Sequence, residues 1–214
     1  MPTQPRLRTT TTKAVKLAFL CLATISPAHS QTAAPFKSGL YATFSTSLGS
    51  FTAQLFEKDV PRTVKNFVGL AQGTRPWYDP TLKGFVRKPL YDHITFHRVT
   101  PGVMIQTGDP TGKGNHNCGV KIADEFLPGI LFNGPGRLAM ANTGSADSGG
   151  CQFFITEQPM PTWNGKYTVF GQLVSGQNVV TAIDRREVHN EKPVDPVILN
   201  GVSIFRVGPA SAHP

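Results

Sequence analysis

Short alternating runs of apolar and polar residues make up most of the chain from about residue 39 onward, a pattern typical of β-strands. Phe51, Ala53 and Leu55 share one face of such a run. Leu48-Gly49-Ser50 separates this run from the preceding one, which begins at Tyr41. Two alternating runs joined by a short turn predict a β-hairpin.

Two segments have the period of a helix instead. In the first, which follows Pro61, the apolar positions at i, i+3, i+4 and i+7 are Val64, Phe67, Val68 and Ala71. Gly73 then stands where a helix C-cap is expected. The second helix is predicted at Gln177–Asp184, with Val179, Val180 and Ile183 on one face. Many short strands with Gly and Pro turns, and only two helices, predict a mainly β fold, an antiparallel sandwich or barrel.

The first 30 residues have a different composition. They carry four basic residues and no acidic one, then an apolar run over residues 14–25, then Ala28-His29-Ser30. This layout predicts a secretory signal peptide cleaved near Ser30, and therefore an exported protein, periplasmic or extracellular. The apolar run is shorter than the roughly 20 residues that span a bilayer, so we expect no stable membrane insertion after processing; a buried helix is the alternative interpretation. We divide the chain into a signal peptide (1–30), a short tail (31–38), one domain (39–208) and a C-terminal tail (209–214).

The charge balance changes once this leader is removed. The whole chain has 21 basic and 13 acidic residues, a formal net charge of +8. Without the four basic residues of the leader, 17 basic residues remain and the net charge is +4. No run of five or more Lys and Arg residues remains in the domain, so binding of nucleic acid or another polyanion has little support.

The chemistry concentrates in residues 91–108. Alternation places Arg98 on one face of a strand, and a turn at Thr100-Pro101-Gly102 leads to a returning strand that carries Met104 and Gln106. If the turn centres near Gly102, Gln106 lies opposite Arg98, within reach of the guanidinium. This predicts that the Arg98 guanidinium is held in one orientation beside an apolar surface that includes Met104. The alternative is an arginine that is exposed to solvent on a strand edge.

Several longer segments resemble the cyclophilins, the peptidyl-prolyl cis-trans isomerases. They are FHRVTPGVMIQTGDPTG, ADEF, RLAMANTG, CQFFIT and WNGKYTVFGQL, which begin at residues 96, 123, 137, 151 and 163. The resemblance covers the chain from about Gly39 to Val207. It implies a closed eight-stranded antiparallel β-barrel capped by two α-helices, with an active groove on the outer face.

The resemblance also assigns roles to individual residues. Arg98 matches the catalytic arginine of the family. The matching substrate-binding positions are Met104, Gln106, Ala141, Asn142, Gln152 and Phe154. Three groove positions depart from the family pattern, since Val103 replaces a Phe, Trp163 a Leu and Tyr167 a His. The loop from Asn142 to Gln152 is one residue longer than the common pattern, and these departures leave substrate preference and cyclosporin affinity open.

Isomerisation of a prolyl bond breaks no bond, so it needs no nucleophile, metal or cofactor. The enzyme must bind the twisted amide better than either planar form. In the twisted amide the proline nitrogen regains a localised lone pair, to which Arg98 can donate a hydrogen bond. The alternative is a cyclophilin-fold binding module that holds Pro-containing segments with weak turnover.

The partners follow from this interpretation. We expect a monomer that binds proline-containing peptides and unfolded or exported proteins, with weak cyclosporin binding as a further expectation whose affinity the sequence leaves open. The resemblance also places Cys118 and Cys151 side by side at the edge of the groove, and an exported protein favours a disulfide between them. Two free thiols are the alternative. His116 and Cys118 lack a convincing ligand set for a metal.

Overall fold

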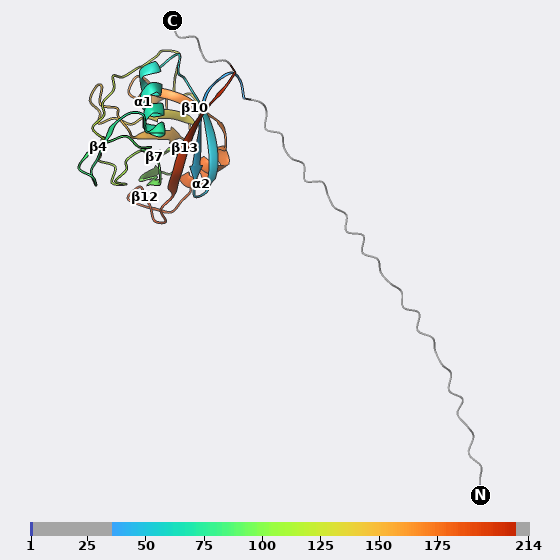
Figure 1. The fold of residues 1–214 in the computed structure, drawn as a ribbon. Coiled ribbons are helices and arrows are strands. Elements are labelled where there is room, and N and C mark those ends of the chain that lie inside the picture. The colour runs from blue at the N-terminus through green and yellow to red at the C-terminus, as the bar shows by residue number, and fades with distance from the viewer. Residues whose placement is uncertain (2–35, 209–214) are drawn as a thin grey trace. The chain divides into compact units, whose positions relative to one another are not determined.

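The computed structural model describes residues 36–208 together with Met1 (Figure 1). The predicted signal peptide beyond Met1 and the C-terminal tail lie outside the described residues. The strands are β1 (Gly39–Thr46), β2 (Gly49–Leu55), β3 (Trp77–Asp79), β4 (Gly84–Val86), β5 (Ile94–Thr95), β6 (Arg98–Thr100), β7 (Met104–Thr107), β8 (Arg137–Met140), β9 (Phe153–Thr156), β10 (Val169–Ser175), β11 (Val188–His189), β12 (Lys192–Pro193) and β13 (Ile198–Val207). The helices are α1 (Pro61–Gln72), α2 (Gln177–Asp184) and the 3-10 turn η1 (Pro161–Trp163). No helix among the described residues is long and apolar enough to cross a membrane.

The main sheet contains nine strands in the order β5-β13-β1-β2-β10-β8-β9-β7-β6, and all of their pairings are antiparallel. Its two edge strands, β5 and β6, are separated in sequence only by Phe96 and His97. The sheet therefore returns on itself through one interrupted strand, half of which pairs with β13 and half with β7. Counted this way the barrel has the predicted eight strands, although covalent chain rather than a hydrogen-bonded ladder completes the circuit.

Both predicted helices are confirmed. Helix α1 starts at Pro61, where proline is favoured because the first helical N–H needs no partner. It ends at Gly73, whose φ of 73° lies in the left-handed region that glycine adopts without strain. A Cβ at this position would also come within 2.6 Å of the Lys88 backbone. Figure 1 shows α1 near one end of the sheet and α2 near the other.

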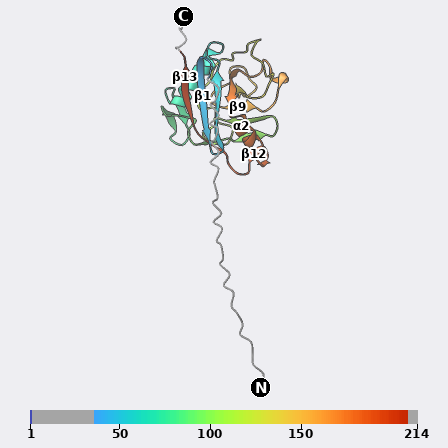
Figure 2. The ribbon, with the colours of Figure 1, turned by 90° about the vertical axis from the view of Figure 1, so that its right-hand side faces the viewer.

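The predicted hairpin is also present, and Figure 2 shows its first strand, β1, lying beside β13. Its turn comes earlier than predicted, at Ser47 and Leu48, because Gly49 and Ser50 already pair with β1. The Thr46 hydroxyl stabilises this tighter turn. It accepts a hydrogen bond from the Leu48 N–H at 3.1 Å and donates one to the Gly49 carbonyl at 2.7 Å.

Aromatic rings fill the space between the sheet and α1. Phe67 of α1 packs edge-on against Phe153 at 5.4 Å between ring centroids, and it contacts Phe44, Tyr91 and Phe170 at 6.0, 5.2 and 5.1 Å. All five side chains are buried. Such ring pairs add to the free energy gained by burying apolar area. The helix is therefore held to the sheet chiefly through Phe67.

The domain begins slightly before the predicted boundary at residue 39. Phe36, which the sequence places in a tail, packs against Tyr41 at 4.9 Å and Phe205 at 5.8 Å between ring centroids. The Tyr41 hydroxyl donates a hydrogen bond to the Lys37 carbonyl. These contacts extend the folded unit by a few residues at its N-terminal side.

Replacing Phe67 with alanine is expected to lower the free energy of unfolding by about 3–5 kcal/mol, because the change removes a buried ring and leaves a cavity. Urea unfolding with the disulfide intact measures this loss. Phe85→Ala is the matched control, since the Phe85 residue is 65% exposed, and we expect it to cost under about 1 kcal/mol. Equal stability of the two variants would contradict the packing described here.

Candidate active site

A hollow of about 230 Å³ lies on the outer face of the barrel, over strands β6, β7, β8 and β9. Its lining residues are Arg98, Thr100, Val103, Met104, Gln106, Ala141, Asn142, Phe154, Trp163 and Tyr167. Every predicted groove residue except Gln152 is among them, and Thr100 is an addition. The structure thus brings together residues spread over about 70 positions of the chain.

The alternation of side chains along the strands separates this hollow from the core. In β9, Phe153 packs into the main core while its neighbour Phe154 belongs to a second apolar cluster beneath the hollow. In β7 the same holds for Ile105, which faces the core, and Met104, which faces the hollow. Successive side chains of a strand point to opposite faces. The same strands therefore build the barrel interior and the floor of the site.

Aromatic side chains form one wall of the hollow. The ring of Phe154 meets Trp163 at 5.3 Å and Tyr167 at 5.2 Å between centroids, both nearly perpendicular. Behind it, Phe132 stacks on Phe154 at 6.0 Å with an angle of 9°. Phe132 and Phe154 are buried, whereas Trp163 and Tyr167 are only partly buried. The wall is therefore held rigidly from behind and offers apolar surface to a ligand.

Arg98 stands at the rim of the hollow, and its predicted pairing with Gln106 across the β6–β7 ladder is confirmed. No hydrogen bond joins the two side chains among the described residues, although the sequence placed Gln106 within reach of the guanidinium. The Gln106 amide nitrogen donates instead to Gln152 Oε1 at 2.8 Å. The guanidinium is held by Glu191, with Nε to Oε2 at 2.9 Å and Nη2 to Oε1 at 3.1 Å. A carboxylate is the stronger acceptor because the bond is charge-assisted.

A second hollow of about 160 Å³ adjoins the first and shares Gln106, Ala141 and Asn142 with it. Gln152 lines this second hollow, so the structure places it beside the first hollow and not within it. Its amide nitrogen donates to the carbonyls of Gly114 and His116 at 3.1 and 3.0 Å. The side chain holds a loop through these bonds, and its role in binding the substrate stays a prediction.

A disulfide joins the same loop to the start of β9. Cys118 and Cys151 are bonded, with their Cα atoms 6.2 Å apart. Because Cys151 precedes Gln152 directly, the covalent bond and the amide hydrogen bonds hold the loop in the same place. The disulfide and the Gln152 hydrogen bonds therefore hold this loop against the segment that begins at Cys151, beside the second hollow.

Two ionisable groups next to the site have shifted pKa values. The pKa of Glu191 is lowered, first by its hydrogen bond from Arg98 and then by that from Thr100, so the carboxylate form is favoured. The pKa of His97 is lowered mainly by burial, which the negative charge of Asp109 partly offsets. His97 is buried, and neither ring nitrogen has a hydrogen-bond partner among the described residues.

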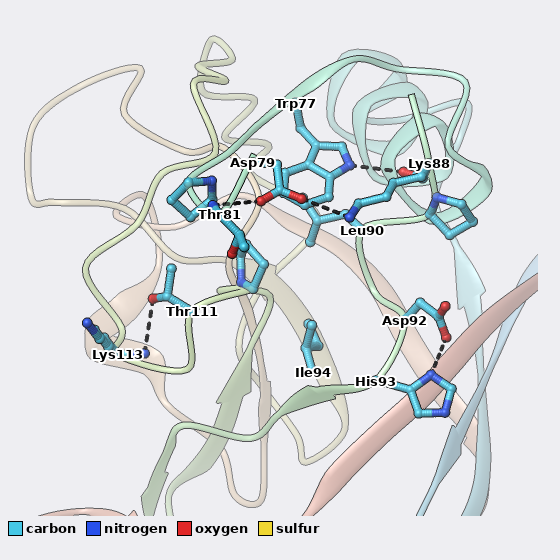
Figure 3. Close-up of a pocket in the computed structure, with 13 residues that line it drawn as sticks. Trp77, Asp79, Thr81, Lys88, Leu90, Asp92, His93, Ile94, Thr111 and Lys113 are labelled. Carbon is cyan, nitrogen blue, oxygen red and sulfur yellow. Dashed lines mark hydrogen bonds and ion pairs between the residues drawn. The ribbon is translucent and has the colours of Figure 1, made fainter. Parts of the chain in front are cut away.

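A larger cavity of about 590 Å³ lies elsewhere, between the β3–β4 hairpin and the segments around residues 88–94 and 110–113. Figure 3 shows that charged groups around it face one another. Lys88 pairs with Asp79 at 2.8 Å, and His93 contacts Asp92 at 2.7 Å. Polar groups that already satisfy one another leave little to recognise a substrate, so the smaller hollow beside Arg98 is the stronger candidate.

Comparisons with known proteins identify the family of this chain. Residues 41–204 match the family model described as cyclophilin type peptidyl-prolyl cis-trans isomerase/CLD. The chain belongs to the cyclophilin family. Peptidyl-prolyl cis-trans isomerase A of Mycobacterium tuberculosis is 44% identical over 166 residues, which cover 76% of this chain and 91% of that protein. Isomerase B of Streptomyces anulatus is 41% identical over 169 residues, which cover 77% and 96%.

A solved structure shows the same fold. The cyclophilin of Cryptosporidium parvum, crystallised in the presence of the dipeptide Ala-Pro, is similar with a TM-score of 0.68 and 28% identity. The similarity covers 78% of this cyclophilin and 99% of that chain. The predicted mainly β cyclophilin architecture and membership in the isomerase family are thereby confirmed.

Sequence reasoning missed three residues of the site. Thr100 follows Arg98 at the i+2 position of the same strand, so alternation alone could have placed it on this face. Phe132 and Glu191 carry no local signal, because one sits in an irregular segment and the other in a turn 93 residues from Arg98. Their positions depend on long-range packing.

Acidic pH is expected to destabilise this cyclophilin partly through His97. The unfolded chain protonates this ring near its ordinary pKa of 6.5, whereas the folded chain does so only at lower pH. Between these two values the unfolded state binds more protons, so the free energy of unfolding falls as the pH drops through that window. An NMR titration of the His97 ring measures its pKa directly, and a value at or above 6.5 would contradict this expectation. His97→Gln should remove this part of the pH dependence.

Proposed function

We propose that this cyclophilin isomerises X-Pro peptide bonds in the hollow beside Arg98, and that Arg98 is its catalytic residue. A peptide bond is planar because of resonance, and rotation about it has a barrier of roughly 18–20 kcal/mol. The two isomers of an X-Pro bond are close in energy, but they exchange over tens of seconds or longer. A site that binds the half-rotated amide more tightly than either planar form lowers this barrier.

The observation that carries the proposal is the position of the Arg98 guanidinium at the rim of an apolar hollow. Glu191 occupies Nε and Nη2, while Nη1 has no partner among the described residues. Nη1 is therefore available to donate to the lone pair that localises on the proline nitrogen as the amide twists. A charge-assisted hydrogen bond contributes about 1.5–3 kcal/mol, or roughly one to two decades in rate.

The rest of the acceleration must come from holding the substrate. Met104 and Phe154 form an apolar floor on which a pyrrolidine ring can pack, and Trp163 stands at its side. The Asn142 side chain donates to the Lys166 carbonyl at 2.7 Å and accepts from the Gly144 N–H at 3.1 Å, so it braces its own loop. We therefore expect the main chain at Ala141 and Asn142 to fix the residues before proline. The Cryptosporidium relative, crystallised with Ala-Pro present, supports proline-containing peptides as the ligand class.

Arg98→Ala is expected to lower kcat/KM about 10- to 100-fold, because it removes the one charge-assisted donor to the twisted amide. NMR exchange rates of an Ala-Pro peptide, with catalytic amounts of protein, measure the effect. Arg98→Lys should restore little, since an ammonium cannot take the bidentate position on Glu191. Arg62→Ala, on the exposed start of α1, is the matched control and should match the wild type. An unaltered rate in a folded Arg98→Ala protein would exclude this catalytic role.

We also propose that the enzyme is exported and acts on exported proteins. The basic residues, short apolar run and Ala28-His29-Ser30 ending of the N-terminal segment support this proposal. The disulfide between Cys118 and Cys151 adds support, because structural disulfides persist in oxidising compartments.

Expression of the full chain in a bacterium, followed by fractionation and N-terminal sequencing, tests the export proposal. We expect the mature protein in the exported fraction with its N-terminus near Gln31, because cleavage follows the small residues that end at Ser30. A protein that keeps Met1–Ser30 and stays in the cytosol would contradict the proposal. A variant with Lys13 and Lys16 replaced by Glu should accumulate unprocessed, since the two new carboxylates offset Arg6 and Arg8 and the leader loses its net positive side-chain charge.

A further inference from the structure

The carboxylate of Glu191 reaches the guanidinium of Arg98 from the β11–β12 hairpin. Its two oxygens accept from Nε at 2.9 Å and from Nη2 at 3.1 Å, and Oε1 also accepts from the Thr100 hydroxyl at 2.6 Å. The main chain adds a fourth bond, from the Val99 N–H to the Glu191 carbonyl at 2.7 Å. Glu191 is thus attached to β6 through both its side chain and its backbone.

The backbone of the hairpin presents Glu191 in a defined direction. Asn190 and Glu191 form the two-residue turn between β11 and β12, with φ values of 50° and 61°. A two-residue hairpin turn of type I′ has this left-handed conformation at both central positions, and Asn or Gly is the residue usually found there. Glutamate has no such preference. A glutamate at this position is therefore not explained by the conformation of the turn. Its carboxylate accepts hydrogen bonds from Arg98 and Thr100, which indicates that the side chain itself has a role.

The contact with Glu191 leaves one nitrogen of the guanidinium, Nη1, without a hydrogen-bond partner among the described residues. The bidentate contact takes the edge made by Nε and Nη2, and Arg98 has no other hydrogen-bond acceptor among the described residues. Among the described residues no hydrogen bond joins Gln106 to Arg98, whose side-chain acceptor is Glu191. The Arg98 side chain is 47% exposed, so without Glu191 it would sample several rotamers over the rim.

We propose that Glu191 is a positioning residue, which holds the Arg98 guanidinium so that Nη1 faces the bound prolyl amide. The proposal rests on the catalytic role assigned to Arg98 above. A planar fork gripped along one edge by a carboxylate has its remaining donors fixed in direction. Glu191 therefore acts on the transition state through Arg98 and touches no part of the substrate itself.

This role predicts an effect on turnover with little effect on binding. Glu191→Ala is expected to lower kcat about 3- to 10-fold, in keeping with the modest strength of a half-exposed ion pair. KM should stay within about twofold, because the apolar floor that binds the ring is untouched. Glu191→Gln, which has the same size and keeps one acceptor oxygen, should fall between Glu191→Ala and the wild type. Asp195→Ala removes the same charge from a nearby exposed position that has no described contact with Arg98, and should leave kcat unchanged.

A double-mutant cycle on an Ala-Pro peptide separates this role from a structural one. In the Arg98→Ala background, Glu191→Ala should cause no further loss of kcat. A loss of the same size in both backgrounds, a change in KM alone, or an unchanged or raised kcat in folded Glu191→Ala and Glu191→Gln would overturn the proposal. If Arg98→Ala itself leaves the rate unchanged, the assignment of Arg98 fails first, and this outcome is distinct from a failure of Glu191 alone.

The side-chain resonance of Arg98 gives a readout that does not depend on activity. In 15N-labelled protein the Arg98 Nε–H signal should be sharp and protected from exchange with water, because Glu191 accepts this proton. Glu191→Ala should abolish the protection, while Asp195→Ala should leave it as in the wild type. Equal protection with and without the Glu191 carboxylate would also overturn the proposal.

Discussion

The alternation of side chains along strands β7, β8 and β9 is the constraint on which the rest of this structure depends. Phe153 and Ile105 point into the barrel, so their neighbours Phe154 and Met104 must point out of it. A one-residue slip in register would exchange the two sets and destroy both the core and the hollow. The floor of the site is therefore formed by the same strands as the barrel, and its position follows from the register of the sheet.

This arrangement suits a reaction in which no bond is broken. The site has to provide an apolar surface for a ring, a donor for one nitrogen, and little freedom to relax around the planar substrate. The stacked rings of Phe132 and Phe154 provide the surface, and the disulfide at Cys151 holds the neighbouring loop. Arg98 is the exception, since it is a long, half-exposed side chain on a rigid wall. The ion pair with Glu191 restricts the rotamers of Arg98, so that its guanidinium points in a fixed direction toward the prolyl amide.

Local signals in the sequence were sufficient for the two helices, the hairpin and one cross-strand pair of the site, but not for the assembly of the groove. The period of α1 and its terminal Gly73 are local features, and the pairing of Arg98 with Gln106 follows from counting residues across a short turn. The membership of Met104, Gln106, Asn142 and Phe154 in one groove came from motif resemblance, because no local rule brings segments about 40 residues apart together.

The side-chain hydrogen bonds could not be predicted in the same way. Gln106 lies opposite Arg98 as expected, yet its amide bonds to Gln152, which is 46 residues away in sequence. The acceptor that does hold Arg98 lies 93 residues away in a two-residue turn. Which of several nearby polar groups pair depends on relative acceptor strength and on tertiary distances, and neither can be read from a strand pattern.

A crystal structure of this cyclophilin with a bound Xaa-Pro peptide tests the central claim most directly. The account predicts that the proline ring packs on Met104 and Phe154, with Arg98 Nη1 within hydrogen-bond reach of the prolyl amide and Glu191 still bonded to Nε. A proline seated in the cavity between Asp79 and Ile94, or an Arg98 side chain turned away from the peptide, would contradict it.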